Sequence, residues 1–72
     1  MFDGEALRER REQMEISQEE LAERVGVSSQ TIGRWERGVV APQGQNLVRL
    51  AEAIEKPLEF LFVDAPFRVS TA

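Results

Sequence analysis

The most restrictive feature of this sequence is Gly26, which stands between two short segments with the apolar spacing of helices. The first segment begins with the pattern Ser-x-x-Glu, in which Ser17 and Glu20 can each accept a backbone N–H from the opposite end of the first turn. A left-handed residue at Gly26 would end this helix after about nine residues, a length that is marginal without tertiary packing. The residues expected on its buried face are Leu21, Ala22 and Val25.

The second segment is predicted to form a helix that begins at Ser28 or Ser29 and stops at Gly38. One face of this helix carries Val27, Ile32 and Trp35, and the opposite face carries Gln30, Gly33, Arg34 and Arg37. We assign the apolar face to the core and the other face to the outside. A glycine inside a helix costs about 1 kcal/mol relative to alanine, so Gly33 is either neutral drift or a gap that lets the backbone approach a binding partner.

Two short helices joined by three or four residues have the layout of a helix-turn-helix. Steeply crossed helices approach each other closely, and the small side chain of Ala22 suits such a crossing. The structural core of the motif is predicted to consist of Leu21, Ala22, Val25, Val27, Ile32 and Trp35, with Gly26 in the turn.

The remaining segments predict three more helices. Asp3 can cap a first helix that ends near residues 13–15, and residues 39–44 are typical of a loop because they include Pro42 and Gly44. A fourth helix follows from the spacing of Leu47, Leu50, Ala51 and Ile54, and a short fifth is expected to open at Pro57. We therefore expect an all-α fold of five short helices over residues 1–63, followed by a tail over residues 64–72.

The composition disfavours an enzyme. The chain has no cysteine, histidine or tyrosine, so most of the usual acid, base and nucleophilic side chains are missing. We expect no metal, no cofactor and no small-molecule ligand. The sequence also lacks an apolar run of about 18 residues and the layout of a signal peptide, which predicts a soluble, cytoplasmic protein without membrane contact.

The net charge of −4 counts against a polyanionic partner, but the charges are unevenly distributed. Acidic residues outnumber basic ones both before residue 26 and after residue 41. The segment between them carries Arg34 and Arg37 against Glu36 alone. The only net-positive part of the chain is therefore the second helix of the motif and its flanks.

The chain resembles the Cro/C1 family of helix-turn-helix DNA-binding domains, which have the λ-repressor-like fold. The resemblance runs from about Leu7 to Phe62, through "LRERREQMEISQEELAERVGVSSQTIGRWERG" and then a proline followed by "NLVRLAEAI". The blocks "SQEELAERVGVS" and "IGRWERG" are specific when they occur together. The resemblance implies that residues 29–37 enter the major groove of DNA.

Residue by residue, the resemblance implies two sets of DNA contacts. Glutamine can bind adenine and arginine can bind guanine in bidentate fashion, so residues of these types are suited to reading bases. A helix N-terminus also offers unpaired N–H groups to a phosphate, which suits Gln18. The predicted base-reading residues are Ser29, Gln30 and Arg34, and the predicted backbone contacts are Gln18, Ser28, Thr31, Arg37 and Gln43.

The resemblance further implies that Glu36 forms a buried ion pair with an arginine of the first helix, for which Arg11 is the candidate. The alternative is an ordinary solvated glutamate. Loss of one partner of a buried pair costs about 3–5 kcal/mol, so the two alternatives predict different effects of replacing Arg11.

Two parts of the chain depart from the family pattern. Residues 39–41 contain no lysine or arginine, so phosphate contacts there would need backbone N–H groups, Arg37, or Gln43 and Gln45, and the salt dependence of binding should be shallow. The C-terminal end carries more apolar side chains than one short helix can bury. Such surface is typical of a partner interface, here Phe60, Phe62, Val63 and Phe67.

The sequence therefore favours a sequence-specific, double-stranded DNA-binding transcriptional regulator of the repressor kind. A homodimer on a pseudo-palindromic operator would raise the affinity of so acidic a chain. The alternative is a protein-interaction module on the same fold, for instance an antitoxin-like or regulatory partner that binds through the apolar C-terminal segment.

Overall fold

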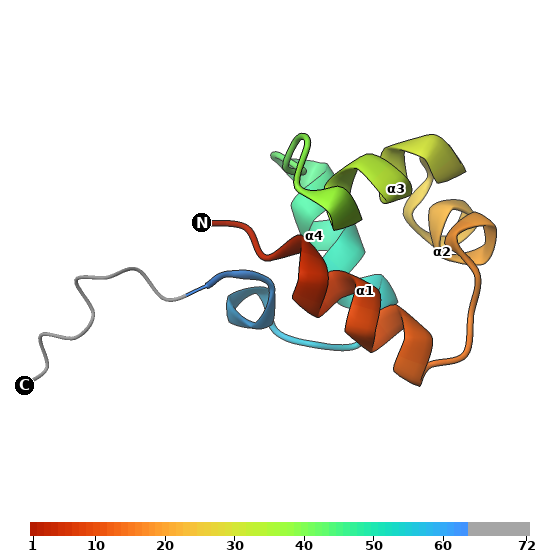
Figure 1. Ribbon diagram of the computed structural model, residues 1–72, viewed down its shortest axis with the longest axis horizontal. Helices are drawn as coiled ribbons and strands as arrows, with labels where there is room; N and C mark the ends of the chain where they lie inside the picture. The colour runs from red at the N-terminus through yellow and green to blue at the C-terminus, as the bar shows by residue number, and fades with distance from the viewer. Residues whose placement is uncertain (64–72) are drawn as a thin grey trace, which may run out of the picture.

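The computed structural model describes residues 1–63, and these residues form four α-helices and one short 3-10 helix (Figure 1). The helices are α1 (Gly4–Gln13), α2 (Gln18–Val25), α3 (Ser29–Arg37), α4 (Gln45–Ala53) and the 3-10 helix η1 (Leu58–Leu61). The prediction of an all-α helix-turn-helix fold is confirmed. The predicted tail, residues 64–72 with Phe67, lies outside the described residues.

Helices α1, α2 and α3 begin at their predicted capping residues, and α2 and α3 end at the predicted glycines. The Asp3 carboxylate accepts a hydrogen bond from the Ala6 N–H at 3.1 Å, and the Ser17 hydroxyl accepts one from the Glu20 N–H at 3.0 Å. Gly26 and Gly38 follow α2 and α3 in the left-handed region, with φ of 92° and 77°. Each glycine thereby ends its helix at a conformation that other residues adopt at a steric cost.

The capping box at the start of α2 is only half formed. The Glu20 carboxylate lies 3.4 Å from Arg24 Nη2, one turn further along the helix, instead of bonding back to the Ser17 N–H. Both partners of this contact are about half exposed, so the ion pair contributes little to stability. The Ser17 side chain alone therefore caps α2.

The expected fifth α-helix is wrong in type and in its starting residue. Pro57 lies before the helix in extended backbone, with ψ of 159°, and the four residues after it form a 3-10 helix. Phe62 is extended again because residues 61–63 pair with the N-terminus: the Asp3 N–H donates to the Leu61 carbonyl at 2.7 Å and the Val63 N–H to that of Met1 at 2.8 Å. This antiparallel pairing ends the helix after one turn.

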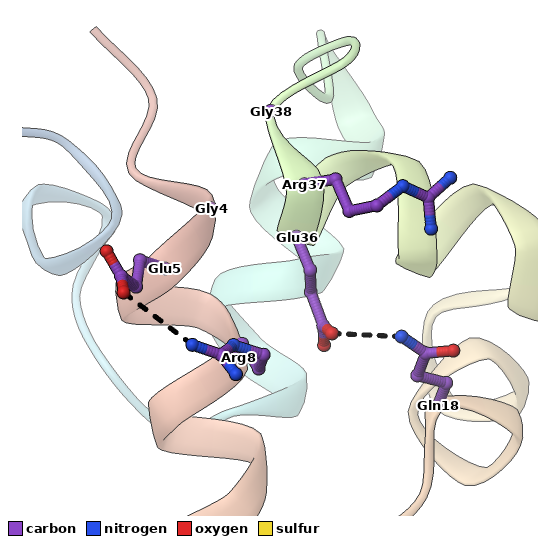
Figure 2. A pocket seen from close by; sticks show the side chains of 7 residues that line it. All are labelled: Gly4, Glu5, Arg8, Gln18, Glu36, Arg37 and Gly38. Atoms are coloured by element: carbon purple, nitrogen blue, oxygen red, sulfur yellow. Dashed lines mark hydrogen bonds and ion pairs between the residues drawn. The ribbon is translucent and has the colours of Figure 1, made fainter.

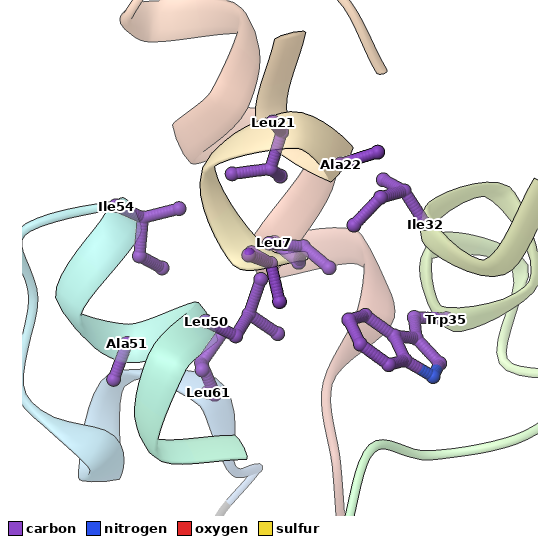
Figure 3. Close-up of a cluster of buried hydrophobic side chains, with 10 residues drawn as sticks. Leu7, Leu21, Ala22, Ile32, Trp35, Leu50, Ala51, Ile54 and Leu61 are labelled. Carbon is purple, nitrogen blue, oxygen red and sulfur yellow. The ribbon is translucent and has the colours of Figure 1, made fainter. Parts of the chain in front are cut away.

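The core lies where α1, α2, α3, α4 and η1 converge (Figure 3). Trp35 is 3% exposed and contributes the largest side chain, and Leu50 of α4 is fully buried. A buried tryptophan removes about 150–250 Å² from water, so Trp35 is a main source of stability. The buried apolar residues are Leu7, Leu21, Ala22, Val25, Ile32, Trp35, Leu50, Ala51, Ile54 and Leu61.

Glu55, which follows α4, adopts a conformation that glycine usually supplies. Its φ is 58°, and the Lys56 N–H after it donates to the Ala51 carbonyl at 3.1 Å. A non-glycine residue in the left-handed region costs about 1–2 kcal/mol. This cost arises at Glu55, where the chain turns from α4 toward η1.

Candidate nucleic-acid interface

The turn between α2 and α3 consists of Gly26, Val27 and Ser28. The Ser28 hydroxyl accepts a hydrogen bond from the Thr31 N–H at 3.2 Å and lies 2.9 Å from the Thr31 hydroxyl. Val27 is half-buried against the core. The turn is thus anchored on both sides, which fixes the direction in which α3 leaves it.

The outward face of α3 is polar and basic. Gln30, Arg34 and Arg37 are exposed and Ser29 is half-buried, whereas Ile32 and Trp35 on the opposite face are buried. Three ion pairs occur within residues 1–63, and neither Arg34 nor Arg37 belongs to them. Two guanidinium groups therefore stand on this face without a neutralising carboxylate within 4 Å in the described part of the chain.

Gly33 is buried, although the sequence predicts that it faces solvent. The Gln18 amide and the Arg37 guanidinium lie over it, so that an added Cβ would stand 3.1 Å from Arg37 Nη1 and 3.6 Å from Gln18 Nε2. Helical periodicity correctly places Gly33 on the same face as Gln30 and Arg37. Periodicity cannot predict that the side chains of Gln18 and Arg37 cover a glycine.

Arg11 and Glu36 form the ion pair implied by the resemblance. Arg11 Nε lies 2.6 Å from Glu36 Oε2 and Arg11 Nη2 lies 3.2 Å from Glu36 Oε1, with the Glu36 side chain only 3% exposed. Gln18 Nε2 donates to the same Oε1 at 3.0 Å (Figure 2), and Arg11 Nη1 donates to the Ile16 carbonyl at 2.9 Å. The hydrogen bond to Glu36 raises the pKa of Arg11 above its ordinary value, against the desolvation that burial imposes.

This ion pair also connects the core to the outward face. Glu36 joins α1 through Arg11 and α2 through Gln18. Gln18, predicted to contact the DNA backbone, therefore has its amide nitrogen fixed by Glu36. Gln18 and Arg37 lie on the same side of Glu36 (Figure 2). All three residues line a cleft of about 550 Å³, to which α1 contributes Gly4, Glu5 and Arg8.

The loop between α3 and α4 presents a mixed surface. Gln43 is exposed, while Pro42 is buried. Val39 and Val40 are 63% and 49% exposed, and with Met1 and Phe2 they line a shallow apolar groove of about 450 Å³. The loop therefore has polar amides near α4 and apolar side chains near α3.

The candidate interface residues at the C-terminal end have different environments. Phe60 is half-buried against the core with the Lys56 ammonium 5.1 Å from its ring centre. Phe62 is 39% exposed and meets Phe2 edge to face, at a centroid distance of 6.2 Å, and Val63 is 46% exposed. Of the four candidates, Phe62 and Val63 present exposed apolar surface, Phe60 packs inward, and Phe67 is not described.

Two contacts that hold the site in place are not predicted by the sequence. Gly4, in the first turn of α1, lies against the Trp35 and Glu36 carbonyls at the end of α3, and Arg10 Nε donates to the Ile54 carbonyl at 2.9 Å. Both contacts join residues more than 30 positions apart, and no local sequence pattern predicts contacts of that kind.

Among residues 1–63, no helix is long and apolar enough to cross a membrane, and no acidic cluster could hold a metal ion.

The fold and the exposed basic face of α3 define a helix-turn-helix domain. The helix-turn-helix family model matches residues 7–61, and the chain belongs to this family. It is 40% identical over 58 residues to the repressor protein C2 of Salmonella phage P22, covering 81% of this chain and 27% of that repressor. The chain therefore corresponds to about a quarter of the length of that relative.

Two solved structures share the fold. The P22 c2 repressor in complex with a synthetic operator superimposes with a TM-score of 0.82 at 37% identity, covering 89% of this chain and 98% of that one. The restriction-modification controller protein C.AhdI of Aeromonas hydrophila gives a TM-score of 0.76 at 36% identity, covering 82% and 86% of the two chains.

Proposed function

We propose that this protein binds double-stranded DNA in a sequence-specific manner and acts as a transcriptional regulator of the repressor kind in the cytoplasm. The observation that carries the proposal is the outward face of α3, where exposed Arg34 and Arg37 follow a capped turn and have no carboxylate partner within residues 1–63. The similarity to a repressor solved on operator DNA supports it. Residues 1–63 would form the DNA-binding domain.

In this proposal α3 lies in the major groove. Gln30 and Arg34 lie one turn apart on the outward face and would read bases within one or two pairs of each other, with Ser29 beside them. Phosphates would be contacted by the remaining polar groups around the motif. These are Gln18, Ser28, Thr31, Arg37 and Gln43.

Replacing Arg34 by alanine tests the role in base reading. A bidentate arginine–guanine contact is worth about 1–3 kcal/mol of discrimination, so Arg34→Ala should weaken binding to the preferred site by about tenfold or more. The measurement is a titration of the variant against duplexes substituted at each position of the site. Discrimination should disappear at one or two adjacent base pairs and persist elsewhere.

Arg49→Ala is the matched control, because it removes the same charge from α4, beside Gly26 and away from the outward face of α3. It should leave base discrimination unchanged. If Arg34→Ala weakened binding equally at every sequence, Arg34 would contact phosphate and the assignment would be wrong.

We further propose that the protein acts as a homodimer on a pseudo-palindromic operator and that Phe62 and Val63 contribute to the dimer interface. Both are exposed at the end of the described chain, close to exposed Met1 and to Phe2. A dimer that binds two half-sites at once would have a much higher affinity for the operator than a single domain has for one half-site.

Val63→Asp should disrupt this dimer. A carboxylate in an apolar interface loses hydration without gaining a partner, so the variant should sediment as a monomer where the wild type sediments as a dimer. Affinity for the full operator should fall about a hundredfold while affinity for an isolated half-site stays the same. Val48→Asp is the matched control at similar exposure on α4, and equal dissociation of both variants would refute the assigned interface.

A second candidate function is a protein-interaction module on the same fold. Exposed Val39, Val40, Phe62 and Val63 favour it, because apolar surface of this kind is typical of partner interfaces. Salt dependence separates the two functions, since binding to phosphates releases counterions and weakens as salt rises. A protein that binds no duplex but copurifies with a protein partner would have the second function.

A further inference from the structure

The outward face of α3 contains a hollow of about 270 Å³. Gly33 contributes only backbone atoms to its lining, and the other lining residues are Gln18, Ser29, Gln30, Arg34 and Arg37. Gly33 itself is buried under the Gln18 and Arg37 side chains, so the hollow opens beside it, between longer side chains that point the same way.

The walls of this hollow are rich in hydrogen-bond donors. Arg34 and Arg37 each carry five N–H groups and belong to no ion pair within residues 1–63, and Gln30 adds an exposed amide. The Gln18 amide nitrogen is engaged by Glu36 at 3.0 Å. Donors therefore outnumber acceptors in the lining, so a group with acceptors fits the hollow best and an apolar group such as the thymine methyl fits it poorly.

The position of the hollow distinguishes a base from a phosphate. A helix in the major groove turns the centre of its exposed face toward the base edges, while the phosphates lie to either side. The hollow lies near that centre, because exposed Gln30, Arg34 and Arg37 line it, whereas buried Ile32 and Trp35 define the opposite face of α3. Among the bases, guanine presents two acceptors to the major groove, O6 and N7.

We propose that Gly33 is a specificity-determining residue: because it has no side chain, Arg37 can lie against the helix and leave the hollow beside Arg34 open to the edge of a guanine. This inference rests on the proposed DNA binding. An added Cβ would stand 3.1 Å from Arg37 Nη1 and 3.6 Å from Gln18 Nε2. A methyl group at this position therefore pushes the Arg37 guanidinium outward, into the hollow.

Gly33→Ala tests the proposal because stability and binding should change in opposite directions. Alanine is the better helix former, so the variant should unfold at a higher temperature than the wild type. Its affinity for the preferred duplex should fall about tenfold or more, and its affinity for a duplex of unrelated sequence should fall by much less, because the displaced Arg37 can still reach a phosphate. Gln13→Ala, at the exposed end of α1, is the control and should leave both affinities unchanged.

A second measurement identifies the guanine directly. Each guanine of the preferred duplex is replaced in turn by 7-deazaguanine, which lacks the N7 acceptor. One guanine in each half-site should cost the wild type about tenfold in affinity, and that cost should nearly vanish for Gly33→Ala. A Gly33→Ala protein with undiminished preference for the site, or a wild type insensitive to every N7 deletion, would overturn the proposal.

The outcomes also separate this inference from the proposed function. If the wild type prefers no duplex, DNA reading itself fails. If the wild type has a preferred site that Gly33→Ala binds equally well, DNA reading stands and only the role of Gly33 is wrong.

Discussion

Replacing Arg11 by alanine should destabilise the domain by about 3–5 kcal/mol, because the Glu36 carboxylate would remain buried without its charge partner. The Glu36 side chain is 3% exposed and the Arg11 side chain 12%, so water cannot easily compensate. Arg11 also donates to the Ile16 carbonyl, which would lose that hydrogen bond. A domain of this size has little stability to spare, so we expect much of the variant to be unfolded at room temperature.

Equilibrium denaturation followed by circular dichroism measures this effect. The matched control is Arg8→Ala on the same helix, because Arg8 pairs with Glu5 at 3.6 Å between side chains that are 47% and 70% exposed. Loss of this surface pair should cost under about 1 kcal/mol. Equal destabilisation of the two variants would show that the pair of Arg11 and Glu36 has no special role in the fold.

Gly4→Ala should also be strongly destabilising, because α1 begins in direct contact with the end of α3. An added Cβ at Gly4 would lie 2.2 Å from the Trp35 carbonyl oxygen and 2.6 Å from that of Glu36. These are backbone atoms, which cannot rotate away as a side chain does. Overpacking of this kind typically costs about 1–3 kcal/mol, and we expect a loss of unfolding free energy at the upper end of that range.

The control for this prediction is the other helical glycine. At Gly33 an added Cβ meets the ends of two side chains, Arg37 and Gln18, and the nearest contact is 3.1 Å. Gly33→Ala should therefore be stabilising where Gly4→Ala is destabilising, although both changes raise helix propensity. A thermal unfolding midpoint for Gly4→Ala at or above that of the wild type would contradict the close packing of α1 on α3.

The parts of the fold that could be predicted from the sequence are those determined locally. Ser17, Ser28, Gly26 and Gly38 set helix ends through hydrogen bonds and φ values that involve residues at most four positions away. Apolar spacing then identified the buried faces of α2, α3 and α4, because burial follows helical periodicity. The pattern around Gly26 is sufficient to predict the helix-turn-helix motif.

The features that could not be predicted depend on residues far apart in the chain. The 3-10 helix η1 ends early because Leu61 and Val63 pair with the N-terminal segment. Gly33 is buried because Gln18 reaches it from another helix. The pairing of Arg11 with Glu36 was available only through resemblance to a family, since nothing local links residues 25 positions apart.

Selection of bound duplexes from a random pool, at two protein concentrations, determines whether this protein recognises a DNA sequence. We predict enrichment of one pseudo-palindromic site whose half-sites lie about one helical turn apart, with a guanine at the position that Arg34 reads. At the lower concentration the full site should be enriched and at the higher one isolated half-sites should also appear. A pool that remains random at both concentrations, recovered from correctly folded protein, would contradict sequence-specific DNA binding by this chain.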